Sequence, residues 1–300
     1  MSPDKSSSDM LRGSFPPIVT PFRNGQVDYE AFKRLVQRQV QAGSDGIVVA
    51  GTTGEPTMLT LDERRELLRS AVRTANGALT VVAATGSHSH AEAALLTESA
   101  AADGAEAVLI VTPYFVKPPE RALIAYFRDL ANRTPLPMLI YHIPGRAGVT
   151  LSPAAVEQIA AKAGNLVGLK HASTDLAYLT ELLIRLGRDF RVFVGQEDLS
   201  FPMLAIGAAG LMSAVGNIFP ERVKALCDAM EGKDFARARE IHFELFEINQ
   251  AVFFDTNPIP IKYMMVRLGL LDDDEHRLPL LPATAELRSR LDAVLERANV

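Results

Sequence analysis

The residue with the clearest chemical potential is Lys170, which follows the apolar run 166–169. A helical pattern over 176–186 comes next, so the run is typical of a buried strand that presents an amine at its carboxyl end. Burying an ammonium group is costly unless a partner or a reaction uses it. Burial also favours the neutral form of an amine, which can attack a ketone and form a Schiff base. At this point a salt-bridged lysine that merely ends the strand remains an alternative.

A second candidate is the turn Gly51-Thr52-Thr53-Gly54, which follows the apolar run 46–50. The glycines permit a tight turn with exposed N–H groups and the threonine hydroxyls add further donors, so the turn could hold a carboxylate. A phosphate loop is a competing interpretation, but the lysine that completes such a loop is missing. An ordinary turn without a ligand is also consistent with this stretch alone.

A tyrosine and an arginine accompany the fifth apolar run, 138–143. Tyr141 could donate and accept a proton beside a Schiff base. Arg146, on a Pro-Gly turn, could bind a carboxylate through two hydrogen bonds. The simpler interpretation is a buried tyrosine with a satisfied hydroxyl and a surface arginine. After the seventh run, the segment 195–198 offers a backbone carbonyl and a carboxylate that could cap a helix.

These residues belong to a regular alternation of short apolar runs and longer helical patterns. Strands that are apolar throughout indicate a parallel sheet whose faces are covered by helices. Eight strand–helix units in about 250 residues predict a closed (β/α)8 TIM barrel. A doubly wound open sheet is the alternative, but its glycine-rich fingerprint after the first strand is absent. The predicted strands are 15–22, 46–50, 80–84, 107–111, 138–143, 166–170, 191–194 and 210–215; the helices that follow them are 29–42, 61–75, 91–102, 119–132, 153–163, 176–186, 199–206 and 220–230.

The alternation stops near residue 232, and this boundary divides the chain. We expect a disordered leader over 1–12, a catalytic (β/α)8 barrel over 13–232 and a C-terminal helical domain over 233–300. The catalytic residues of a TIM barrel lie at the carboxyl ends of its strands, so the candidate residues should meet there. Helical patterns in the C-terminal domain cover 235–253, 261–268 and 285–298.

Composition argues against several classes of partner and cofactor. The net charge of −5 provides no basic surface for nucleic acid, and no apolar run reaches the roughly 18 residues of a membrane span. Cys227 is the single cysteine, which indicates a reducing compartment and a cytoplasmic protein. We expect no metal site, because the histidines near strand ends come from separate segments without carboxylates at ligand spacing. These histidines are His88, His90, His142 and His171.

In this order and spacing the motifs resemble the dihydrodipicolinate synthase/N-acetylneuraminate lyase family of pyruvate-dependent class I lyases. The resemblance extends from Gly13 to about Leu281. It implies a (β/α)8 barrel with a C-terminal helical domain, assembled as a homotetramer of two dimers. It also implies small-molecule substrates, a 2-oxo acid and an aldehyde, and no metal or organic cofactor. The matching motifs are Thr20-Pro21-Phe22, Gly51-Thr52-Thr53-Gly54-Glu55, Thr112-Pro113-Tyr114, Tyr141-His142-Ile143-Pro144-Gly145-Arg146, Gly168-Leu169-Lys170 and Asn257-Pro258-Ile259-Pro260-Ile261-Lys262.

By position, the resemblance assigns Lys170 to the Schiff base with pyruvate or another 2-oxo acid. Tyr141 would relay protons, and Thr52 would link it into a hydrogen-bonded chain. A protonated imine is an electron sink, and it stabilises the carbanion formed when a C–C bond breaks or an α-proton leaves. The resemblance also implies the substrate-binding residues: Thr53 for the carboxylate of the 2-oxo acid, Gly195 and Met212 for the pocket wall, and Arg146 for the carboxylate of aspartate semialdehyde.

Some positions depart from the pattern of the synthases. Phe115 stands where these enzymes typically carry a second tyrosine that reaches across the dimer and completes the proton relay, and it has no hydroxyl. His142 replaces the usual asparagine after the catalytic tyrosine. Leu61 and Arg64 replace histidines that lysine-inhibited synthases tend to have, which argues against feedback by lysine.

The leading prediction is a Schiff-base lyase that condenses pyruvate with an aldehyde such as aspartate semialdehyde. An aldolase or a dehydratase of a hydroxylated 2-oxo acid would use the same imine chemistry. A protein of another class, which binds a 2-oxo acid without catalysis, would not require the amine of Lys170. The geometry of the loops decides between substrates, and the residues that we expect to set it are Phe115, His142, Arg146 and Met212.

Overall fold

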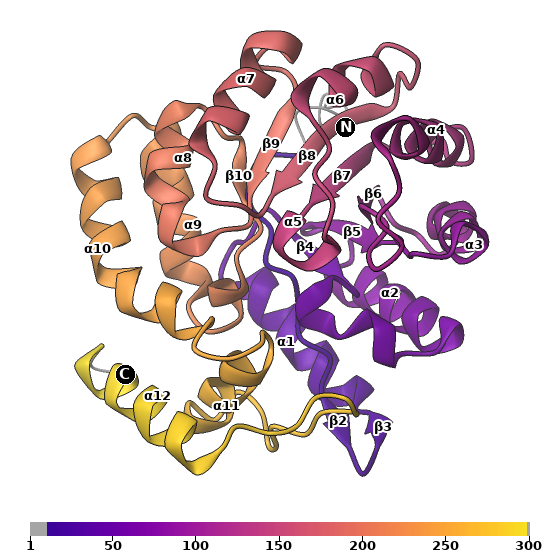
Figure 1. The fold of residues 1–300 in the computed structure, drawn as a ribbon. Coiled ribbons are helices and arrows are strands. Elements are labelled where there is room, and N and C mark those ends of the chain that lie inside the picture. Colours follow the sequence, from indigo (N-terminus) through magenta and orange to yellow (C-terminus); the bar gives the residue numbers. More distant parts are fainter. Residues whose placement is uncertain (1–10, 299–300) are drawn as a thin grey trace.

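An eight-stranded parallel sheet forms the centre of the computed structural model, which describes residues 11–298 (Figure 1). The strands follow chain order from β4 to β10, and β10 then pairs with β1. Every pairing within this sheet is parallel. The strands are β1 (Gly13–Ser14), β4 (Gly46–Val49), β5 (Thr80–Ala84), β6 (Ala107–Val111), β7 (Met138–His142), β8 (Leu166–His171), β9 (Arg191–Val194) and β10 (Gly210–Leu211).

The sheet closes on itself between β4 and the segment that follows β1. Val48 N donates to Pro16 O and Ile18 N donates to Val48 O, both at 3.0 Å. A parallel bridge joins Pro17 to Val48. These bonds complete the ring, so the prediction of a (β/α)8 TIM barrel is confirmed.

The first predicted strand, 15–22, differs most from the structure. Its prolines have no N–H with which to join a ladder, so the regular pairing is confined to Gly13–Ser14. The end of the predicted run instead forms an antiparallel ribbon of β2 (Phe22–Arg23) and β3 (Gln26–Val27). The eighth strand is also shorter than 210–215, because a 3-10 helix begins at Ala214.

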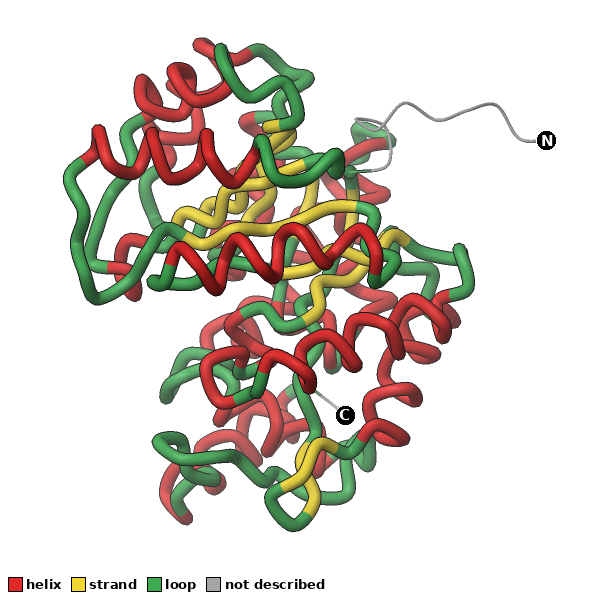
Figure 2. The backbone as a smooth tube through the Cα atoms, turned by 90° about the vertical axis from the view of Figure 1, so that its right-hand side faces the viewer, coloured by secondary structure: helices red, strands yellow, loops and turns green. Residues whose placement is uncertain are grey.

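Helices follow the strands of the barrel and surround it (Figures 1 and 2). Their starts agree with local sequence: Asp28 and Asp175 cap helices with their carboxylates, and Thr60 forms a capping box with Glu63. These helices are α1 (Tyr29–Gln41), α2 (Leu61–Ala75), α3 (His90–Ala102), α4 (Glu120–Ala131), α6 (Pro153–Ala160), α7 (Leu176–Leu186), α8 (Ser200–Ile206) and α9 (Pro220–Glu231).

Side chains on opposite faces of the strands build two apolar clusters. On β4, Ile47 and Val49 belong to the larger cluster, which includes residues of the helices, whereas Val48 belongs to a smaller one. This alternation places the smaller cluster inside the barrel. Leu11 is part of it and is 1% exposed, although the predicted leader 1–12 includes this residue. Residues 1–10 of that leader lie outside the described part of the chain.

The C-terminal segment forms α10 (Phe235–Ala251), α11 (Ile259–Arg267) and α12 (Ala285–Arg297) beside the barrel (Figure 1). Helix α10 packs against α8, α9 and the 3-10 helix Glu197–Leu199, and α11 packs against the 3-10 helix Ala214–Asn217. Because these 3-10 helices follow β9 and β10, the C-terminal segment reaches the carboxyl ends of the strands. No helix between residues 11 and 298 is long and apolar enough to cross a membrane.

Candidate active site

Lys170 and Tyr141 lie beside each other on neighbouring strands. They are register partners between β8 and β7, and Lys170 Nζ lies 4.4 Å from the centroid of the Tyr141 ring. Both side chains are 6% exposed. No carboxylate of residues 11–298 lies within ion-pair distance of the Lys170 amine. A salt bridge therefore does not account for this buried amine, and the interpretation as a nucleophile gains weight.

The threonine turn brings two hydroxyl groups to the same place. Thr52 Oγ1 donates to the Tyr141 hydroxyl at 3.4 Å, and Thr53 Oγ1 accepts from Asn257 Nδ2 at 2.9 Å. The turn is itself a 3-10 helix, Thr52–Gly54, and the carbonyl of Gly54 accepts from Thr20 Oγ1 at 2.7 Å. Thr52 is thus placed to hold the phenol of Tyr141, whereas Thr53 is tied to the C-terminal segment.

These residues surround a cavity of about 40 Å³, which we call the inner cavity. Seven of the eight predicted site residues line it, so the structure brings them together. Asn257, Glu197 and Phe253 also line it and were not among the predicted residues. The full lining is Pro17, Thr52, Thr53, Tyr141, Ile143, Arg146, Lys170, Gly195, Glu197, Met212, Ala214, Phe253 and Asn257.

Gly195 leaves the space that the Lys170 side chain occupies. A Cβ at this position would lie 2.6 Å from Lys170 Cε and 3.0 Å from Ala172 Cβ. The first of these distances is well below ordinary van der Waals contact. A larger residue at 195 would therefore displace the lysine stem, which explains a glycine here without any need for an unusual backbone angle.

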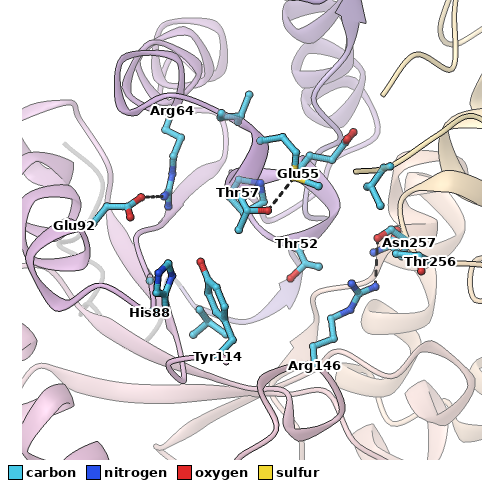
Figure 3. Close-up of a pocket in the computed structure, with 16 residues that line it drawn as sticks. Thr52, Glu55, Thr57, Arg64, His88, Glu92, Tyr114, Arg146, Thr256 and Asn257 are labelled. Carbon is cyan, nitrogen blue, oxygen red and sulfur yellow. Dashed lines mark hydrogen bonds and ion pairs between the residues drawn. The ribbon is translucent and has the colours of Figure 1, made fainter. Parts of the chain in front are cut away.

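A larger cavity of about 490 Å³, which we call the outer cavity, adjoins the first (Figure 3). Thr52, Arg146 and Asn257 line both cavities. Figure 3 shows the Arg146 side chain directed toward Asn257, to whose carbonyl it donates at 3.3 Å. Arg146 follows β7 on α5 (Pro144–Ala147), a single turn that begins at a proline. Its cation is therefore available to an anion that extends from the inner into the outer cavity.

Phe115 is the predicted site residue that does not line either cavity. Its side chain is 86% exposed, and its φ of 72° lies in the left-handed region. Such a conformation is uncommon for a bulky residue. The neighbouring Tyr114, in contrast, lines the outer cavity and lies against His88 with ring centroids 5.1 Å apart.

Glu197 is a buried carboxylate in the wall of the inner cavity. Its Oε1 accepts from Ala214 N at 2.6 Å, while Oε2 has no hydrogen-bond partner among the described residues. Burial raises the pKa of Glu197 to about 7, although the positive charge of Lys170 acts in the opposite direction. The sequence suggested only a capping carboxylate in 195–198. The contact with Ala214 depends on the approach of β9 and β10, so no local pattern could have revealed it.

His142 and His171 form a stack behind the strands that carry Tyr141 and Lys170. His171 Nε2 lies 3.0 Å from the carbonyl of Asp175, and the Nδ1 atoms of the two rings are 3.3 Å apart. Burial lowers the pKa of both rings, that of His142 to about 3, and each stacks on the ring of Tyr178. Neither histidine lines the cavities. Within residues 11–298, no three His, Cys, Asp or Glu side chains are grouped to hold a metal ion.

Comparison with known proteins agrees with this geometry. The family model described as "Dihydrodipicolinate synthetase family" matches residues 10–298. The chain belongs to this family. The family prediction from the motifs is therefore confirmed. A member named 4-hydroxy-tetrahydrodipicolinate synthase, from Thermus thermophilus, is 45% identical over 289 residues, which is 96% of each chain. One of that name from Aquifex aeolicus is 38% identical, covering 97% of this chain and 99% of its own.

Solved structures of the dihydrodipicolinate synthetase family have the same fold. The crystal structure of dihydrodipicolinate synthase from Aquifex aeolicus superposes with a TM-score of 0.94 at 38% identity, and 96% of this chain and 98% of that chain are covered. A structure described as the first monomeric dihydrodipicolinate synthase variant also has a TM-score of 0.94, at 34% identity, with 97% and 98% covered. The likeness extends over nearly the whole chain, including the C-terminal helices.

Proposed function

We propose that this protein is a class I lyase that condenses pyruvate with an aldehyde, as a 4-hydroxy-tetrahydrodipicolinate synthase does with aspartate semialdehyde. The observation that carries the proposal is the position of Lys170. Its amine is buried without a carboxylate partner among the described residues, 4.4 Å from the Tyr141 ring, in a cavity that Thr52 and Thr53 also line. Relatives of 36–45% identity bear the name of that synthase, which supports the assignment.

The proposed reaction begins at Lys170 Nζ. The neutral amine adds to the ketone carbon of pyruvate, and the resulting carbinolamine takes up a proton and loses water to leave a protonated imine. The imine draws electrons from the neighbouring methyl group, which loses a proton and becomes a carbon nucleophile. That carbon attacks the aldehyde carbon, a C–C bond forms, and the aldehyde oxygen takes up a proton. The amino group of the aspartate semialdehyde part then adds to the imine carbon, which closes a ring, and the C–N bond to Lys170 breaks to release the amine. Tyr141 is the group placed to carry protons in these steps, and Thr52 orients its hydroxyl at 3.4 Å.

The lining of the two cavities assigns a place to each substrate. Lys170 lines the inner cavity, so we assign pyruvate to it, with the carboxylate on Thr53 and the adjacent amides. Arg146 lines both cavities, so its guanidinium can bind the carboxylate of the second substrate at their junction. Gly195 and Met212 complete the wall around the imine. The large outer cavity would also admit a longer 2-oxo acid, which keeps an aldolase or a dehydratase as the second candidate.

We also propose a cytoplasmic homotetramer, built as a dimer of dimers from barrels (13–232) with C-terminal helical domains (233–300). Phe115 supports a partner at this surface, because a bulky apolar side chain that is 86% exposed in one chain gains from being covered. The exposed Phe243 and Phe246 on α10 offer a second apolar surface. The monomeric variant among the solved relatives makes sedimentation velocity the appropriate check.

The test of the catalytic proposal is intact mass after borohydride reduction in the presence of pyruvate, with Lys170→Ala as the control. A pyruvate-sized adduct on the wild type alone is the expected result, and an assay with aspartate semialdehyde then follows. An adduct that forms only with longer 2-oxo acids would transfer the assignment to an aldolase or a dehydratase. A protein that binds pyruvate without any adduct would belong to the non-catalytic class.

A further inference from the structure

A buried ion pair joins the threonine turn to the C-terminal helices. Lys262, on α11, donates to Glu55 Oε1 at 2.6 Å, and both side chains are 0% exposed. Lys262 Nζ also donates to the carbonyl of Glu275 at 2.7 Å and lies 4.5 Å from the centroid of the Phe22 ring. The amine therefore has its contacts inside the protein, between the barrel and the C-terminal segment.

Glu55 is the residue that ends the threonine turn. It directly follows the 3-10 helix Thr52–Gly54 and has left-handed backbone angles, with φ 56° and ψ 45°. A residue with a Cβ adopts this conformation at a cost and needs surrounding contacts to hold it there. Those contacts are Lys262 at Oε1 and the ring of His276, whose Nδ1 lies 3.1 Å from Oε2. The carboxylate thus anchors the end of the turn.

The same C-terminal segment contacts the turn at a second point. Asn257, just before α11, donates from Nδ2 to Thr53 Oγ1 at 2.9 Å. Its carbonyl accepts from Arg146 at 3.3 Å. Asn257 therefore connects both candidate carboxylate-binding residues, Thr53 and Arg146, to the segment that leads into α11, while Lys262 on that helix holds Glu55.

Loss of either Lys262 or Glu55 would leave the other side chain as a buried charge without its partner. Burial lowers the pKa of Lys262, and the Glu55 carboxylate opposes this effect. An ammonium group in such surroundings is stable because the carboxylate compensates its charge, and removing one partner leaves the other buried and uncompensated. The turn would then have to move so that water could reach the remaining charge.

We propose that Lys262 and Glu55 are positioning residues of the 2-oxo acid site. Their ion pair holds the turn at the place where Thr52 reaches the Tyr141 hydroxyl and Thr53 faces the inner cavity. The C-terminal helices are therefore a part of the substrate site and not an appendage to a complete barrel. This inference rests on the proposed function, because the turn matters to catalysis only if Lys170 forms the imine.

The test compares three variants with the wild type. Lys262→Met removes the ammonium but keeps an unbranched apolar stem, and the double variant Glu55→Gln/Lys262→Met removes both buried charges. Arg267→Met is the matched control, because Arg267 lies on the same helix and pairs with Asp292 at 2.6 Å, but is 53% exposed and outside both cavities. The first measurement is the pyruvate concentration that gives half-maximal borohydride adduct. The second is hydrogen exchange of the Gly54 and Glu55 amides, which donate to Gly51 and Thr52.

We expect Lys262→Met to raise the half-maximal pyruvate concentration about tenfold or more, since small displacements of positioning groups are costly. Exchange of the two amides should accelerate in the same variant, while Arg267→Met behaves as the wild type. The double variant should fold well, because no charge is left uncompensated, yet retain the higher pyruvate requirement. If Lys262→Met does not fold, the double variant still tests whether the ion pair positions the turn.

Failure of the positioning role and failure of the proposed function give different results. A folded double variant with the pyruvate requirement and amide exchange of the wild type would overturn the positioning role and leave the pair as a purely structural contact. A wild type that forms no adduct with pyruvate would instead refute the proposed function. In that case amide exchange still reports whether the ion pair holds the turn.

Discussion

Tyr141 and Lys170 are register partners on adjacent parallel strands, and the lysine amine lies 4.4 Å from the centre of the phenol ring. Neighbouring parallel strands place register partners side by side, so this arrangement follows directly from the pairing of β7 with β8. Thr52 then reaches the same phenol from the end of β4, which lies three strands away from β7 around the barrel. A nucleophile and a proton carrier are therefore placed by the sheet itself.

The first prediction concerns the hydroxyl of Tyr141. Tyr141→Phe keeps the ring beside the lysine but removes the proton carrier, so steady-state condensation should fall about 10²- to 10⁴-fold. The borohydride adduct with pyruvate should still form, only more slowly, because Lys170 is intact. Turnover and trapping measured on the same preparation check this. Undiminished turnover would exclude Tyr141 from the proton transfers.

Gly195 supplies a steric prediction. In Gly195→Ala the new methyl group would lie 2.6 Å from Lys170 Cε, so the lysine must move and adduct formation should fall at least about tenfold. Gly164→Ala is the control, since a Cβ there meets no atom of the described part of the chain within 4 Å. Equal trapping rates in the two variants would mean that the lysine adjusts without loss.

The histidine stack makes stability depend on pH. His142 has a pKa of about 3 in the folded protein against 6.5 without burial, so the unfolded chain binds the proton more readily. The contribution of the neutral His142 ring to the free energy of unfolding is therefore complete above pH 6.5 and is lost as the pH falls toward 3. His142→Asn should reduce this slope by up to about 1.4 kcal/mol per pH unit. Urea unfolding at a series of pH values measures it, and an unchanged slope would contradict a neutral, buried ring.

The carboxyl group of Glu197 makes stability depend on pH in the opposite direction to His142. Its pKa rises from 4.5 to about 7 on burial, so the folded protein holds the proton more tightly than the unfolded chain. Its contribution to stability is complete below pH 4.5 and is lost as the pH rises through 7. Glu197→Gln should therefore gain stability relative to the wild type with rising pH, by up to about 3 kcal/mol. Urea unfolding of both proteins at a series of pH values tests this. A difference in the free energy of unfolding that stays the same at every pH would refute it.

Lysine should not inhibit the protein. Arg64 lines the outer cavity, where its buried guanidinium pairs with Glu92 at 3.3 Å and donates to the carbonyl of Ala84 at 2.9 Å. The ammonium group of a free lysine would meet this fixed positive charge and a carboxylate that is already engaged. Initial rates measured with increasing lysine should stay constant. A saturable decrease in rate would show that the cavity accepts an amino acid despite Arg64.

The sequence by itself determined the elements and the candidate chemistry. Apolar strands alternating with capped helices are local patterns, and Lys170 at a strand end follows from the same alternation. The barrel then brings strand ends together, which is why the positions of Thr52, Tyr141 and Gly195 in one cavity could be predicted. The prediction of a regular strand over 15–22 was wrong because its prolines have no N–H to donate, so only single bonds and one bridge to Val48 close the ring there. The apolar pattern of the run does not reveal this restriction.

Only the tertiary structure decided which distant residues complete the site. Asn257 reaches Thr53 across 204 positions of sequence, and Lys262 reaches Glu55 across 207. The Oε2 of Glu197, which has no hydrogen-bond partner within residues 11–298, and the exposed side chain of Phe115 likewise depend on where separate segments come to lie. Such contacts have no local signature, because a buried charge is stable only beside the partner that the fold supplies.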